Sequence, residues 1–228
     1  MCAGYLIWVK WHQSNGAYHA LVQINYKEKQ MKRWILVPVA LVIALASSVA
    51  SAAQGDWLGR ARVININPDA SSSALSLDAS SETTLELDFT YFVTNNLGLE
   101  LILATKKHDI TAGGAPVGSV ALLPPTLTLQ YHFAPDSPSF RPYVGAGVNY
   151  TKFYDINLGG GTLTVDSSSW GGALQIGADF PINKQFFFNV DLKKIWIDTD
   201  VKTVATGATA ANFKINPLVI GVGVGMKF

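Results

Sequence analysis

The chain has 228 residues, of which 49% are apolar and only 14% are charged, and its formal net charge is +1. Such a composition excludes a disordered chain and argues against a soluble domain with a charged surface, so a membrane location is the leading prediction. Because no cluster of five or more Lys or Arg occurs, nucleic acid is excluded as a partner.

The first predicted element is a secretory signal peptide at residues 31–52. It starts with two basic residues, continues with an apolar stretch and ends on the small-residue motif Ala50-Ser51-Ala52. Residues 1–30 precede this signal, so we interpret them as an upstream extension and expect translation to start at Met31. Two alternatives stay open: a real leader of unusual length, and an uncleaved anchor in place of the signal.

Removal of the first 52 of the 228 residues leaves a mature chain, residues 53–228, without the single cysteine, Cys2. A secreted chain without cysteine has no disulfide, no thiol nucleophile and no Cys-ligated metal. Its stability must therefore come from a closed sheet or a sizeable core.

The mature chain is dominated by alternation of apolar with polar or small residues, the period of a β-strand. In one segment Leu97, Leu99 and Leu101 share a face, while Glu100 and Ile102 lie on the other. Eight strands are predicted, at residues 57–66, 85–91, 97–103, 126–133, 144–151, 170–180, 186–199 and 218–228. An apolar-out, polar-in pattern in segments of about ten residues is typical of a transmembrane barrel. We therefore predict an all-β fold, an eight-stranded antiparallel transmembrane β-barrel.

The predicted connections alternate in length. Short turns are expected at residues 94–96, 134–139 and 181–184, and long loops at 67–81, 109–118, 155–168 and 200–211. Outer-membrane barrels have this arrangement, with both termini on the periplasmic side. The predicted location is the bacterial outer membrane.

Aromatic residues gather near the strand ends, as in the two interfacial girdles of a membrane barrel. The C-terminal Phe228 also resembles the signal by which the outer-membrane assembly machinery recognises its substrates. The predicted girdles are Tyr91, Tyr131, Phe133, Tyr143 and Phe228 at the periplasmic end, and Tyr150, Phe153, Tyr154, Trp170 and Trp196 at the other.

Charged residues of both signs occupy the inward positions of the predicted strands. Buried charges must be paired, so a network of ion pairs across the lumen is expected. It either only satisfies the interior, which we favour, or also blocks the periplasmic half. The predicted network is Arg60, Arg62, Glu86, Asp88, Glu100, Asp179, Asp191 and Lys193, with Gln130 also facing inward.

Two segments carry a resemblance to a known family: Leu123-Pro124-Pro125-Thr126-Leu127 and the stretch from Arg141 to Tyr150. Together with the glycine-rich last strand ending in Phe228, they resemble the OmpW family over essentially the whole mature chain. The resemblance implies an eight-stranded outer-membrane barrel for the passage of small hydrophobic molecules, including alkanes in the AlkL branch. The first long loop is rich in serine and departs from the family, so the permeant does not transfer.

An eight-stranded barrel is too narrow for a wide aqueous pore, so an apolar solute needs another exit. We hypothesise an apolar vestibule lined by Ile102, Leu122 and Phe153, with lateral exit into the lipid beside Pro124 and Pro125. Neither proline donates a hydrogen bond to a neighbouring strand. An equally weighted alternative is that the two prolines merely bend or end the strand. The expected partners are small hydrophobic permeants, outer-membrane lipid and lipopolysaccharide.

No catalytic residue, cofactor or metal site is predicted. The two mature histidines, His108 and His132, are expected about one strand length apart, which argues against a shared catalytic site. The main alternative to a channel is a structural or adhesive barrel that acts through its extracellular loops. A narrow ion channel is a third possibility and would need a polar path past the paired charges.

Overall fold

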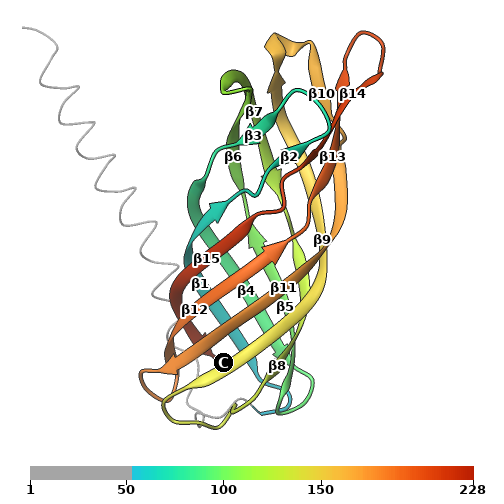
Figure 1. Cartoon of the computed structure of the whole chain (residues 1–228). Coiled ribbons are helices and arrows are strands. Elements are labelled where there is room, and N and C mark those ends of the chain that lie inside the picture. The colour runs from blue at the N-terminus through green and yellow to red at the C-terminus, as the bar shows by residue number, and fades with distance from the viewer. Residues whose placement is uncertain (1–52) are drawn as a thin grey trace, which may run out of the picture. The chain divides into compact units, whose positions relative to one another are not determined.

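The computed structural model describes residues 53–228, which form one β-barrel (Figure 1). The predicted upstream extension (1–30) and signal peptide (31–52) lie outside the described residues. Apart from strands and turns, the described chain contains a short 3-10 helix, η2, at Gly159–Gly161. None of the helices in this part of the chain is long and apolar enough to cross a bilayer.

Eight antiparallel strands form the closed lower part of the barrel, which we call the trunk. Each pairs with its neighbour around the ring, and the last strand pairs with the first, from Leu58↔Lys227 to Asn67↔Leu218. The predicted eight-stranded fold is confirmed. In ring order the trunk strands are β1 (Trp57–Asn67), β4 (Glu82–Phe92), β5 (Leu97–Ala104), β8 (Thr126–His132), β9 (Arg141–Leu158), β11 (Ser168–Pro181), β12 (Phe186–Ile195) and β15 (Leu218–Lys227).

Side chains of the trunk alternate between an apolar outer face and a mixed inner face. Leu85 on β4 is 70% exposed, whereas its neighbour Glu86 is buried. The inward glycines of β15 make room for large side chains of adjacent strands. A Cβ on Gly223 would come within 2.1 Å of the Ala61 backbone oxygen, so only glycine fits this close approach. The outer face is the apolar band that a lipid environment requires.

The barrel continues beyond the trunk as a set of shorter strands, which we call the collar. These strands gather at the upper end in Figure 1 and pair with one another and with the last part of β9. The collar strands are β2 (Ser71–Ser72), β3 (Leu77–Ala79), β6 (Lys106–Ala112), β7 (Ala115–Leu123), β10 (Leu163–Val165), β13 (Asp198–Thr203) and β14 (Thr209–Lys214).

The collar corrects the prediction of four long loops, because strands occupy much of each. Residues 109–118, for example, belong almost entirely to β6 and β7, joined by a turn at Gly113 and Gly114. In β6, His108 and Ile110 are buried while Lys107 and Asp109 are exposed. The outer face of the collar is therefore polar, so a search for apolar-out alternation misses these strands.

Three further details differ from the sequence predictions. The strand expected at residues 186–199 is interrupted at Trp196 and Ile197, between β12 and β13, where the Trp196 amide donates to Gly172. Tyr143 and Phe153 were assigned to the aromatic girdles, but both are buried inside the barrel. Their odd-numbered positions on β9 place them opposite the outward-facing Val144 and Val148.

The lumen contains three layers of different chemistry. At the end with the short turns, Leu58, Phe92 and Phe187 form an apolar floor. Above it lie the buried charges, and above these a larger apolar cluster extends into the collar. The two upper layers form the candidate site.

Candidate functional site

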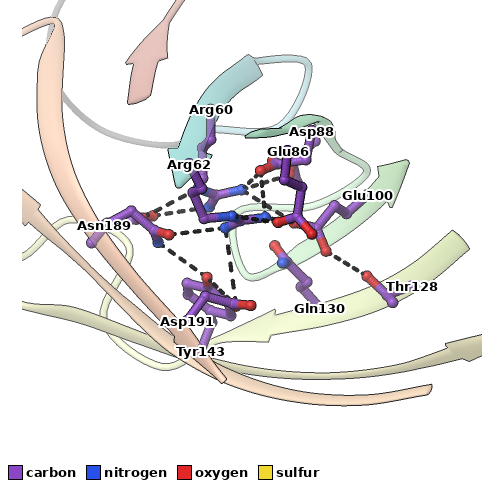
Figure 2. A network of polar contacts seen from close by, with 12 residues as sticks. Arg60, Arg62, Glu86, Asp88, Glu100, Thr128, Gln130, Tyr143, Asn189 and Asp191 are labelled. Atoms are coloured by element: carbon purple, nitrogen blue, oxygen red, sulfur yellow. Dashed lines mark hydrogen bonds and ion pairs between the residues drawn. The ribbon is translucent and has the colours of Figure 1, made fainter. Parts of the chain in front are cut away.

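The charged layer is built around two arginines on β1. Two residues apart on one strand, Arg60 and Arg62 both point into the lumen. Arg60 forms an ion pair with Asp88 at 2.9 Å and a two-pronged contact with Asp179 at 3.0 and 3.3 Å. Arg62 pairs with Glu86 at 2.7 Å and with the second oxygen of Asp88 at 2.5 Å (Figure 2). The two guanidinium groups thus share one carboxylate.

Lys193 on β12, two strands from β1 round the ring, extends the layer. Its ammonium group lies 2.8 Å from Glu86 and 2.6 Å from Asp191. The second oxygen of Asp191 accepts hydrogen bonds from the Tyr143 hydroxyl at 2.8 Å and the Gln175 amide at 2.9 Å. Ion pairs and hydrogen bonds therefore link opposite sides of the barrel.

All eight predicted members of the network are 0% to 4% exposed, so almost no solvent reaches them. Around Arg60, the rings of Tyr143 and Phe187 lie 5.3 and 5.6 Å from the guanidinium carbon and fill the remaining space. The layer contains three cations and five carboxylates. Neutral donors also bind the carboxylates: the Thr128 hydroxyl, for example, donates to a Glu100 carboxylate oxygen at 2.7 Å. The layer fills the cross-section of the trunk with side chains.

Two hollows lie above the charged layer, and their lining is mostly apolar. We call them together the vestibule. The upper hollow lies within the collar, and the lower one extends down to Glu86. They share His108, Leu122 and Ile215 as lining residues. The vestibule therefore runs from the collar to the top of the charged layer.

The structure brings the predicted vestibule residues to these hollows. Ile102 lines the lower hollow, Phe153 the upper one and Leu122 both. Pro124 also lines the lower hollow. Pro125 does not, but its carbonyl accepts a hydrogen bond from the Tyr150 amide at 3.0 Å.

The strand ladder is interrupted beside the two prolines. Pairing of β5 with β8 ends at Ile102↔Thr126, and pairing of β6 with β7 starts at Lys106↔Leu122. The register is continuous across the gap, so residues 103–105 lie opposite 123–125 without ladder pairs. We call this gap the ladder break. The ladder break separates the proline segment from β5 but not from β9. On the β9 side, the Asn149 side chain donates to the Pro124 carbonyl and the Tyr150 amide donates to the Pro125 carbonyl.

One side chain bridges the ladder break. The Thr105 hydroxyl donates to the Leu122 carbonyl at 3.1 Å and lies 2.5 Å from the Tyr154 hydroxyl. Thr105 is not among the site residues predicted from the sequence, and nothing in its local pattern indicates a bridging role. That role follows from the continuous register, which places residue 105 opposite residue 123.

The two histidines occupy different layers. His108 lines the vestibule, whereas His132 packs against Phe92 of the floor, with 4.8 Å between the ring centroids and the rings tilted by 57°. In residues 53–228, no group of three or more His, Cys, Asp or Glu is arranged to hold a metal ion. The hollows have a mostly apolar lining, and the wall beside the lower one lacks ladder pairs at the ladder break.

Comparison with known proteins places this geometry in context. The profile of the OmpW family matches residues 53–228. An uncharacterised outer-membrane protein, y4mB of Sinorhizobium fredii, is 38% identical over 82% of this chain and 86% of its own length. Outer membrane protein W of Vibrio cholerae is 35% identical over 83% of this chain and 97% of its own.

A solved structure has the same fold. The outer-membrane protein OprG of Pseudomonas aeruginosa superposes with a TM-score of 0.67 at 30% identity, covering 79% of this chain and 99% of OprG. Another relative, the dibenzothiophene metabolism operon protein PahQ of P. aeruginosa, is 29% identical over 78% of this chain and 90% of its own length.

Proposed function

The chain belongs to the OmpW family and is an outer-membrane β-barrel, and on that premise we propose that it facilitates passive uptake of small hydrophobic molecules. The solute enters the vestibule from the collar, is stopped by the charged layer and leaves sideways into the membrane through the ladder break. No chemical step and no energy source are needed.

One observation carries this proposal: the lower hollow ends on buried charges but reaches the wall at the ladder break. Ala104, Thr105 and Pro124 line the hollow at that point. On the outer side, Leu103 and Leu123 flank the gap and are each 38% exposed. An apolar molecule that moves sideways there stays in contact with apolar groups, whereas downward movement would require it to displace paired charges.

The energetics favour this route. Transfer of apolar surface out of water is favourable by roughly 25 cal/mol per Å². The vestibule offers such a surface beyond the polar lipopolysaccharide layer, and the acyl chains of the membrane offer it again at the exit. The name of the relative PahQ, which refers to dibenzothiophene metabolism, supports an apolar aromatic solute as one example.

The experiment compares initial uptake of radiolabelled naphthalene in cells lacking the gene with uptake in the same cells expressing residues 31–228. We expect faster uptake of naphthalene and unchanged uptake of a hydrophilic solute of similar size. Equal uptake of several apolar compounds, with the barrel verified in the outer membrane, would overturn the proposal. It would favour a structural or adhesive barrel acting through its exposed collar.

A further inference from the structure

The upper hollow of the vestibule is lined by two polar side chains that its apolar character does not explain. Of the fifteen residues that line the upper hollow, thirteen are apolar, and the other two are His108 on β6 and Thr199 on β13. Each is only 4% exposed. A buried polar group without a partner is unfavourable, so its presence among Leu, Ile, Val and Phe needs a reason.

The side-chain hydroxyl of Thr199 is buried and has no hydrogen-bond partner among the described residues. The residue opposite Thr199 on the neighbouring strand is the apolar Phe213. Valine has nearly the same shape and would remove the unpaired group. A molecule in the hollow would satisfy the hydroxyl at the same place.

His108 has one nitrogen engaged and the other available. Its Nδ1 lies 2.8 Å from the Ser80 carbonyl oxygen. Because a carbonyl can only accept, Nδ1 carries the hydrogen, and in the neutral ring Nε2 is then an acceptor. Within residues 53–228 no hydrogen bond engages Nε2, so the ring presents a fixed acceptor in a hollow that it helps to line.

The two groups come from different strands of the collar, β6 and β13, and line the same hollow. A molecule that occupies the upper hollow therefore meets an acceptor and a hydroxyl that can donate or accept.

We propose that His108 and Thr199 form a hydroxyl-recognition site, which makes the barrel prefer apolar molecules that carry one hydroxyl group, such as alcohols and phenols, over hydrocarbons of the same size. This inference rests on the proposed uptake function and names its substrate class. A hydroxyl group donates to His108 Nε2 and accepts from Thr199, whereas an ether can only accept and a hydrocarbon does neither.

The test compares 2-naphthol, 2-methoxynaphthalene and naphthalene, which share one ring system. Half-saturating concentrations for uptake are measured in cells that express the wild type, His108→Leu or Thr199→Val. We expect each substitution to raise the value for 2-naphthol about fivefold, as for the loss of one neutral hydrogen bond, and to leave naphthalene unchanged. 2-Methoxynaphthalene should respond to Thr199→Val but not to His108→Leu. Thr203→Val, on the same strand outside the hollow, is the matched control.

A direct measurement separates this site from the uptake function. The described chain has two histidines, so ¹⁵N-histidine labelling of the purified barrel in lipid nanodiscs reports His108 with a single companion, His132. The His108 Nε2 resonance should move on addition of 2-naphthol and stay in place with naphthalene. Equal responses to both compounds, or none, would overturn the recognition site. Wild-type cells that take up neither compound faster would instead overturn the uptake function, with the resonance still deciding hydroxyl binding.

Discussion

The charged layer and the vestibule lie in the same lumen, yet the inward-facing side chains change from charged to apolar between one inward position and the next. On β1 the change is from Arg62 to Ile64, and on β5 it is from Glu100 to Ile102. On β12, Lys193 is followed by Ile195. Three strands therefore change from charged to apolar inward residues, and the charged layer bounds the lower end of the vestibule.

The difference shows two ways of filling a narrow barrel. Charges at short distances must be held in directional contacts, so the layer tolerates little displacement. Apolar contacts are non-directional, so side chains of the vestibule can shift around a guest at lower cost. In the proposed uptake function, the charged layer is the barrier and the vestibule is the path. Substitutions that act on only one region test this division.

The largest effect is expected from Arg62→Met, which removes a cation shared by Glu86 and Asp88. Uncompensated buried carboxylates remain, and breaking a buried pair costs about 3–5 kcal/mol. Urea unfolding of the barrel in lipid vesicles measures the change. Lys194→Met removes a pair with the exposed Asp69 and serves as the control, with an expected cost below about 1 kcal/mol. Similar losses for the two variants would show that the layer is no more cohesive than the surface.

Closing the ladder break should slow uptake more than any change that leaves the break intact. Replacing Pro124 with Thr and Pro125 with Val supplies one amide donor toward β5, at residue 124, because residue 125 faces β9 and its carbonyl accepts from the Tyr150 amide. At about 1 kcal/mol for the new bond to β5, opening becomes roughly fivefold rarer, and naphthalene uptake should fall toward that extent. Pro138→Ala, in the turn between β8 and β9, controls for loss of a proline. Unchanged uptake at equal expression would mean that the prolines only shape the strand.

A smaller loss of uptake is expected from Leu122→Trp, because Leu122 lines both hollows. The larger ring narrows their junction while the charged layer is untouched, so uptake should fall by less than for the proline replacement, with the heat-dependent gel mobility of the barrel retained. Leu127→Trp introduces the same ring on the lipid-facing side, where Leu127 is 43% exposed, and should leave uptake unchanged. Equal effects of the two variants would count against the vestibule as the path.

The smallest effect is expected at the collar surface, where Lys202 pairs with Asp166. The hydrogen bond to Asp166 raises the pKa of Lys202 above its ordinary value of 10.5. A raised lysine pKa stabilises the fold below pH 10.5, and the contribution disappears as pH rises through the folded value. Because the pair is exposed, Lys202→Met should leave the thermal midpoint at pH 7 unchanged within error. A clear drop would show that surface pairs also hold the collar together.

The trunk was predictable because apolar residues alternate with inward-facing residues in the same way on every strand, with the apolar residues on the outside. Inward positions of Arg60, Glu86 and Lys193 follow from counting in twos along strands whose outer face is apolar. The collar was not, since its outer face is polar and its inner face apolar. Counting in twos from Ile102 places His108 and Ile110 inward, but the sequence pattern predicts no strand between residues 103 and 126.

The ladder break was predictable only in part. Two prolines indicate a position that cannot donate, but not which neighbour they lose. That choice depends on Asn149, whose amide reaches the Pro124 carbonyl at 3.2 Å and holds the segment to β9. Likewise, no local pattern shows that Thr199 is unpaired, because its surroundings come from strands distant in sequence.

The most direct test of lateral exit is a reversible lock across the ladder break. Residues 53–228 contain no cysteine, so Thr105→Cys with Leu123→Cys creates a single possible disulfide between facing positions. Naphthalene uptake should be low in oxidised cells and recover after mild reduction, and a lock at the paired positions Leu99 and Leu129 should have no effect. Equal uptake before and after reduction of the 105–123 lock would contradict the side exit.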